Sequence, residues 1–197
     1  MYWYENDVKN IERIPYPETQ KRKIAFYGSS SIRLWGNLEN EFTEICPINL
    51  GFGGSTLAAC SWFFERIVPR FEPDSMIVYA GDNDLGDGRH PEEVWLFFMV
   101  LLQKYQKLFP DKMFTFLSIK PSPIRWQLVN QIRYTNQIIF NSLKDLPNTC
   151  YINIFDPMLN AQGKPELKYF EPDKLHVSRE GYNLWKKCIY EQSLKIF

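Results

Sequence analysis

The stretch Lys23-Ile-Ala-Phe-Tyr-Gly-Ser-Ser-Ser31 joins a short apolar run to a glycine and three consecutive hydroxyl side chains. Four more apolar runs follow it, and glycine or proline comes within two residues of the end of each. The five runs are residues 23–27, 45–49, 75–80, 113–119 and 150–155. Continuous apolar runs of this length are typical of parallel strands that are covered on both faces. The sequence therefore predicts five buried parallel strands.

Longer segments with helical spacing separate these runs. The predicted helices are residues 31–42, 56–68, 91–109, 126–146 and 178–194. The third begins at Pro91 followed by two glutamates, which suit the first turn of a helix. Strands that alternate with helices predict an α/β fold, a three-layer α/β/α sandwich around a five-stranded parallel sheet.

The first twenty residues precede the first strand. Trp3, Val8, Ile11 and Ile14 are spaced at about three residues, so we expect residues 1–20 to form a helical arm packed on the outside. No linker or repeat divides the remainder, and we expect residues 21–197 to form one domain.

Composition excludes several function classes. Twenty-three basic and 23 acidic side chains balance among the 197 residues, so no basic face for nucleic acid is expected. The longest apolar run, residues 94–102, is too short to span a bilayer, and no basic amphipathic helix or lipid anchor is seen. The first seven residues include acids and lack the apolar core of a signal peptide. We expect a cytoplasmic protein, and the sequence does not indicate its oligomeric state.

Polar and glycine-rich segments follow the strands. They are Gly28-Ser-Ser-Ser31, Gly51-Phe-Gly-Gly-Ser-Thr56, Gly81-Asp-Asn-Asp84 and, before the last helix, Asp173-Lys-Leu-His176. In parallel sheets the ligand site lies beyond the carboxyl ends of the strands, so these segments are expected at one edge. They supply a hydroxyl, backbone amides, a side-chain amide, a carboxylate and an imidazole. These groups are the components of an acyl-transfer site.

The chain has only two histidines to serve as a base. His90 precedes a proline in a loop rich in glycine and aspartate, and we interpret it as an exposed loop residue. His176 stands three residues after Asp173, so one local turn can bring the carboxylate to the imidazole Nδ1. That contact would leave Nε2 free to take a proton from a serine.

These four blocks, in this chain order, resemble those of the SGNH hydrolases, also called GDSL-type esterases or lipases. The resemblance extends from Lys23 to nearly the end of the chain and implies a flavodoxin-like SGNH hydrolase fold. It implies that Ser30 is the nucleophile and that Asp173 and His176 complete the triad. It also assigns the oxyanion hole to the backbone N–H groups of Ser30 and Gly54 and to the side-chain amide of Asn83.

One position departs from the family pattern. Ser29 replaces the aspartate of the Gly-Asp-Ser motif, and this leaves three adjacent hydroxyl groups. The spacing from Gly28 and to Trp35 favours Ser30 over its neighbours. The variant Gly-Ser-Ser-Ser-Ile-Arg33 is similar to the platelet-activating-factor acetylhydrolase-like branch. The similarity implies a short acyl group such as acetyl. Because no feature for binding a lipid surface is seen, we expect a small-molecule ester, for which an acetylated carbohydrate is one candidate. No cofactor is expected.

A non-catalytic, flavodoxin-like domain that binds a ligand or nucleotide is the alternative. The glycines of residues 51–54 could form a tight turn or cradle a phosphate, but neither a P-loop nor a dinucleotide fingerprint follows the first strand. Asp82, Asp84 and Asp87 lack EF-hand spacing, so no metal is expected. Ile32 stands where the nucleophile elbow requires glycine, which argues against the α/β-hydrolase fold.

Overall fold

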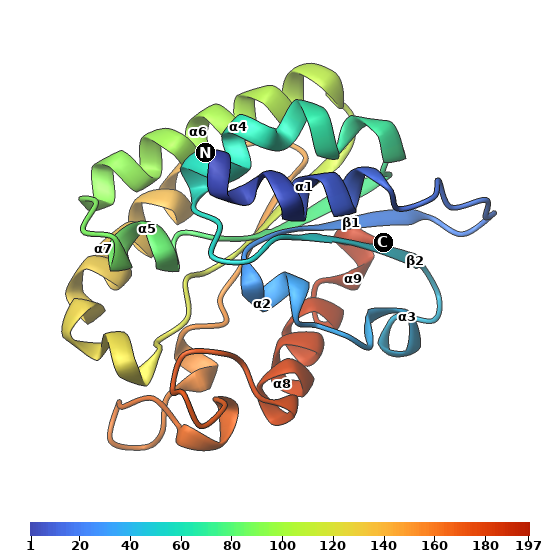
Figure 1. Ribbon diagram of the computed structural model, residues 1–197. Coiled ribbons are helices and arrows are strands. Elements are labelled where there is room, and N and C mark those ends of the chain that lie inside the picture. The colour runs from blue at the N-terminus through green and yellow to red at the C-terminus, as the bar shows by residue number, and fades with distance from the viewer.

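The computed structural model describes residues 1–197 and contains one five-stranded sheet with helices on both faces (Figure 1). The strands are β1 (Lys23–Gly28), β2 (Cys46–Gly51), β3 (Ser75–Tyr79), β4 (Met113–Leu117) and β5 (Thr149–Ile152). All pairs are parallel, and the order is β2-β1-β3-β4-β5. This is the flavodoxin-like order, and it confirms the predicted fold class.

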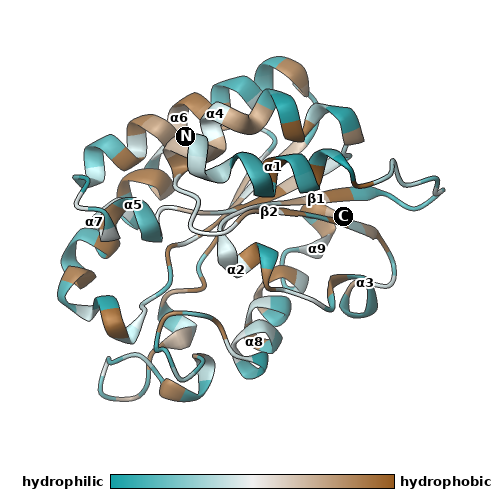
Figure 2. Ribbon diagram, in the orientation of Figure 1, coloured by the Kyte–Doolittle hydropathy of each residue, from teal (hydrophilic) through white to brown (hydrophobic).

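The strands are apolar throughout because the sheet has a core on each face. In β1, Ala25 and Tyr27 belong to a cluster of 32 buried residues, while Ile24 and Phe26 belong to a second cluster of 21 on the other face. Strand side chains alternate between faces, so both sets must be hydrophobic. Figure 2 accordingly shows largely brown strands between helices on which teal and brown alternate.

Two groups of helices cover the sheet (Figure 1). One face carries α1 (Glu5–Glu12), α4 (Leu57–Ile67), α6 (Pro91–Leu108) and α7 (Val129–Leu143). The other carries α2 (Ser30–Arg33), α3 (Leu38–Glu41), α8 (Arg179–Tyr190) and α9 (Ser193–Ile196). The short α5 (Asp82–Gly86) follows β3, and the 3₁₀ segment η3 (Pro123–Leu128) precedes α7. No helix combines the length and hydropathy that crossing a bilayer requires.

The prediction of one helix over residues 31–42 is wrong. The chain forms α2 and α3 instead, because the side-chain amide of Asn49 donates to the carbonyl of Ile32 at 2.8 Å and approaches that of Trp35 at 3.5 Å. These carbonyls would otherwise accept the next bonds of a continuing helix. The predicted helix 178–194 is likewise divided into α8 and α9, and residue 126 lies in the 3₁₀ segment η3.

The predicted helix in the N-terminal segment is present as α1. Its Val8 and Ile11, with Tyr4 just before it, are buried in the larger core cluster. These residues are therefore part of the core on the face of the sheet that α4 covers, and the segment is not only packed on the outside of the domain.

Candidate active site

The end of β1 turns sharply into α2. Gly28 has φ +142°, and a Cβ there would lie 1.9 Å from the backbone oxygen of Tyr79, so only glycine fits. The next residue, Ser29, donates its N–H to that same Tyr79 oxygen at 3.0 Å. This packing of β1 against β3 fixes where α2 begins, and Ser30 is its first residue.

The three consecutive serines differ in accessibility. Ser29 and Ser31 are only 3% and 2% exposed, whereas Ser30 is half-buried. Neither the hydroxyl nor the backbone N–H of Ser30 donates a hydrogen bond within the chain. Ser30 is therefore the serine whose side chain a substrate can reach, which supports its choice over its neighbours.

The glycine-rich loop after β2 presents the second predicted donor. Gly54 has φ +67° and is exposed, and its N–H has no partner within the chain. Two side chains from the N-terminal segment hold this loop: the Tyr4 hydroxyl donates to the Gly54 oxygen at 3.0 Å, and the Asp7 carboxylate accepts from the Gly53 N–H at 2.9 Å. Sequence reasoning missed both contacts, because nothing in the pattern of residues 1–12 points to this loop.

Asn83 supplies the third predicted donor. It lies in α5, and its side-chain nitrogen donates to the Ser55 oxygen at 3.1 Å, which leaves one amide hydrogen unpaired. The three predicted donors thus come after the first three strands: Ser30 after β1, Gly54 after β2 and Asn83 after β3. These strands are neighbours in the sheet, with β1 in the middle. The structure brings these three predicted residues to the same carboxyl edge of the sheet.

Asp173 and His176 meet on the loop before α8. The His176 Nδ1 lies 2.5 Å from Asp173 Oδ2, and Asp173 Oδ1 accepts from the N–H groups of Leu175 and His176 at 2.9 Å each. The hydrogen bond with His176, together with these backbone N–H groups, lowers the pKa of Asp173 to about 2. An ionised carboxylate therefore orients the ring through Nδ1, and Nε2 is left for another partner.

The His176 loop lies beside the segment that follows α2. His176 lines a cavity of about 470 Å³ together with Trp35 and Tyr182, whose rings stack at 4.9 Å between centroids. The Tyr182 hydroxyl also donates to the backbone oxygen of Ser31 at 2.9 Å. These contacts hold α8 and its preceding loop against α2, although no hydrogen bond joins the Ser30 hydroxyl to the His176 ring.

The other histidine lies elsewhere. His90 is exposed and directly precedes α6, and its backbone N–H donates to the Glu93 carboxylate at 2.8 Å. This agrees with its interpretation as an exposed loop residue.

Asp84 connects α5, which also carries Asn83, to α4, the helix that follows the glycine loop. One of its oxygens accepts from the Leu57 N–H at the start of α4 at 2.7 Å, and the other lies 3.5 Å from the Arg89 guanidinium. Its carboxylate is fully buried, and burial raises the pKa of Asp84 to about 6.

The raised pKa of Asp84 predicts a pH-dependent stability. The folded state then binds the Asp84 proton more tightly than the unfolded state does, so stability falls as pH rises from about 4 to about 6. Asp84→Asn removes this contribution. In urea unfolding the difference in unfolding free energy, wild type minus variant, should decrease by about 2–3 kcal/mol between pH 4 and pH 7. Asp87→Asn is the matched control because Asp87 is exposed. Equal pH slopes for wild type and Asp84→Asn would contradict the expectation.

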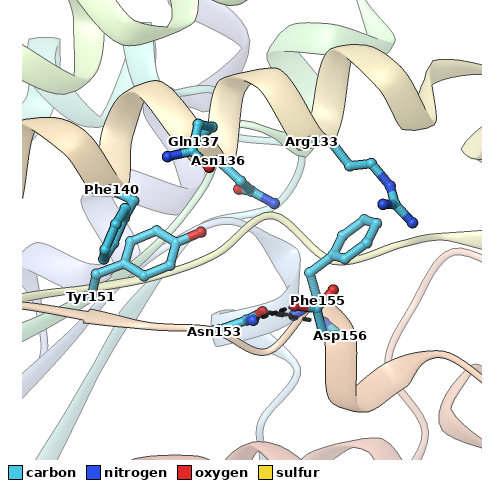
Figure 3. A pocket seen from close by; sticks show the side chains of 8 residues that line it. All are labelled: Arg133, Asn136, Gln137, Phe140, Tyr151, Asn153, Phe155 and Asp156. Carbon is cyan, nitrogen blue, oxygen red and sulfur yellow. Dashed lines mark hydrogen bonds between the residues drawn. The ribbon is translucent and has the colours of Figure 1, made fainter.

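A separate cavity of about 490 Å³ opens between α7 and the end of β5 (Figure 3). Its lining residues are Arg133, Asn136, Gln137, Phe140, Tyr151, Asn153, Phe155 and Asp156. None of the predicted catalytic or oxyanion-hole residues is among them. The site at the edge of the sheet is therefore distinct from this larger hollow.

The sheet order and the groups collected at its carboxyl edge agree with those expected of an α/β acyl hydrolase. Residues 24–184 match the sequence profile of the GDSL-like lipase/acylhydrolase family, and the chain belongs to this family. The predicted resemblance is confirmed, and the protein is a carboxylic ester hydrolase. The family membership favours the hydrolase over the non-catalytic binding alternative.

Solved structures with the same fold are known, although no curated protein sequence matches the chain. A Streptococcus pneumoniae protein provisionally identified as a platelet activating factor has a TM-score of 0.84 at 20% identity, covering 95% of this chain and 91% of that one. A GDSL-like lipase from Bacteroides thetaiotaomicron has a TM-score of 0.81 at 18% identity, and the match covers 98% of this chain and 97% of that one. The family 3 carbohydrate esterase of Clostridium thermocellum has a TM-score of 0.68 at 15% identity, and the match covers 88% of this chain and 95% of that one. At these identities the similarity shows the fold.

Proposed function

We propose that the protein hydrolyses short-chain acyl esters, chiefly acetyl esters, through a Ser30–His176–Asp173 triad. His176 takes the Ser30 proton as the hydroxyl attacks the ester carbonyl, and the N–H groups of Ser30, Gly54 and Asn83 bind the oxyanion. His176 then protonates the leaving alcohol, which leaves the acyl group on Ser30. Water, deprotonated by His176, attacks this acyl-enzyme and releases the acid.

The observation that carries the proposal is the hydrogen bond between Asp173 and the Nδ1 of His176. A carboxylate on Nδ1 fixes the tautomer in which Nε2 accepts a proton, and it stabilises the imidazolium that forms during attack. The unpaired N–H groups of Ser30 and Gly54 add to this support, because donors without partners in the chain are available to a developing negative charge.

Acetylated carbohydrate is the substrate class that the neighbouring surface favours. A cavity of about 370 Å³ adjoins Gly54, and its lining includes Trp3, which is 75% exposed, with Asp87 and Arg89. An exposed indole can stack on the C–H face of a sugar ring while charged side chains bond its hydroxyls. The fold similarity to a protein named as a carbohydrate esterase agrees with this choice.

Initial rates on p-nitrophenyl esters of graded chain length, beside an acetylated monosaccharide, test the proposal. We expect the acetyl ester to be hydrolysed fastest. Trp3→Ala should raise KM for the acetylated sugar by about three- to tenfold and leave p-nitrophenyl acetate unchanged, because an exposed stacking contact contributes about 1 kcal/mol.

Trp62→Ala is the matched control for Trp3→Ala, since Trp62 is another exposed tryptophan, on α4 and outside the lining of this cavity. A rate that increases with acyl length would contradict the short-acyl assignment. Equal KM values for wild type and Trp3→Ala on the sugar would contradict the carbohydrate assignment alone.

A further inference from the structure

A buried ion pair lies next to the proposed oxyanion hole, because its aspartate, Asp82, precedes Asn83 in the chain. The side chains of Lys120 and Asp82 are 3% and 5% exposed, and Lys120 Nζ lies 2.5 Å from Asp82 Oδ2 and 3.1 Å from the Tyr79 hydroxyl. The two charges keep the pair ionised: despite burial, Lys120 and Arg125 hold the pKa of Asp82 below its usual value, and Asp82 raises that of Lys120. Burying such a pair is costly, and the acyl-transfer steps do not use it.

Arg125, in η3, connects this pair to Asn83. Its Nη1 lies 2.9 Å from Asp82 Oδ1, and both Nη1 and Nη2 donate to the Asn83 side-chain oxygen at 3.1 Å. Asp82 Oδ1 itself accepts no aligned hydrogen bond, so the guanidinium N–H groups are directed at the amide while Asp82 balances the charge. Gly86 makes room for this arrangement, because a Cβ there would lie 2.8 Å from the guanidinium carbon.

These partners leave the Asn83 amide one orientation. A guanidinium only donates, so it must face the amide oxygen, and the Ser55 carbonyl only accepts, so it must face the amide nitrogen. Rotating the amide by 180° would oppose donor to donor and acceptor to acceptor. A cation on the amide oxygen also polarises the group and strengthens its remaining N–H as a donor.

We propose that Arg125 is a positioning residue for ester hydrolysis, anchored by the buried Lys120–Asp82 pair and acting through Asn83. It holds the free amide N–H towards the substrate oxyanion. This inference rests on the proposed function.

The same segment also contacts the loop of the base. The backbone N–H of Ile124 donates to the oxygen of Lys174 at 3.2 Å, and Lys174 is the residue after Asp173. The residue next to Arg125 therefore joins the loop of the triad acid to the segment that orients Asn83.

A double-mutant cycle of Arg125→Ala and Asn83→Ala tests the inference on p-nitrophenyl acetate. Arg125→Ala should lower kcat about ten- to hundredfold with KM changed less than about threefold, because the lost contact matters only when the oxyanion forms. In the Asn83→Ala background the same change should cost less than about threefold, since Arg125 then has no amide to orient. Arg133→Ala, a matched arginine on α7, should leave both constants unchanged.

Gly86→Ala supplies a second variant that removes no charge. The added Cβ must displace the end of the Arg125 side chain, and alanine suits the helical backbone of α5. Its kcat should fall in the same direction as that of Arg125→Ala, with an unchanged melting temperature.

Two results would overturn the role of Arg125. One is wild-type kcat in both Arg125→Ala and Gly86→Ala. The other is an equal loss from Arg125→Ala with and without Asn83. If instead Ser30→Ala is as active as wild type, the proposed function itself fails, so the two failures are distinguishable.

Discussion

Ser30→Ala is expected to lower kcat for p-nitrophenyl acetate by about ten-thousandfold to a millionfold, with KM changed little. The alanine removes the oxygen that forms the acyl-enzyme but leaves the N–H groups of the oxyanion hole in place. These groups account for the small rate that remains above the uncatalysed one. Initial rates at saturating ester, with a melting curve for each variant, measure the effect.

Ser29→Ala and Ser31→Ala are the matched controls for Ser30→Ala. Both serines are buried, so these changes should alter stability more than turnover. A fluorophosphonate probe, which reacts only with an activated serine, should add one label per chain, and peptide mass spectrometry should place it on Ser30. Labelling of Ser29 or Ser31, with full activity in Ser30→Ala, would transfer the nucleophile role to that neighbour.

His176→Ala is expected to have a similarly large effect, about ten-thousandfold to a millionfold on kcat. Without the imidazole no group takes the Ser30 proton or returns it to the leaving alcohol. Asp173→Asn should cost up to about ten-thousandfold, because an amide at this position favours the wrong tautomer of the ring. The double variant Ser30→Ala/His176→Ala should be no slower than Ser30→Ala, since the two residues act as a unit.

His90→Ala is the control for the base, because His90 is the only other histidine and is exposed. It should retain wild-type kcat. Substantial activity in His176→Ala, or a further large loss when it is added to Ser30→Ala, would show that another group accepts the proton.

Much of the fold could be predicted because strands that are buried on both faces appear in the sequence as continuous apolar runs. Each strand is apolar on both faces, and the parallel order then places every following loop at one edge. Ser30, Gly54 and Asn83 could be assigned to that edge from their positions after consecutive strands alone. The contact between Asp173 and His176 could also be predicted, because the two residues are only three positions apart in the chain.

The remaining features depend on partners far along the chain. The break between α2 and α3 is imposed by Asn49, which lies on β2. The contacts of Tyr4 and Asp7 with the glycine loop span 50 and 46 residues, and no local pattern encodes them. The contact between Arg125 and Asn83 could not be predicted either. The sequence Lys120-Pro-Ser-Pro indicated the end of a strand, but it did not indicate the direction of the Arg125 side chain.

The contacts of Tyr4 and Asp7 have a consequence for engineering the enzyme. Gly54 is exposed in the glycine loop, and the hydroxyl of Tyr4 and the carboxylate of Asp7 form hydrogen bonds with the backbone of this loop. Libraries aimed at turnover therefore have targets outside the four motif blocks. Substitutions of Tyr4 and Asp7 should therefore change the rate without altering any group that is proposed to touch the ester.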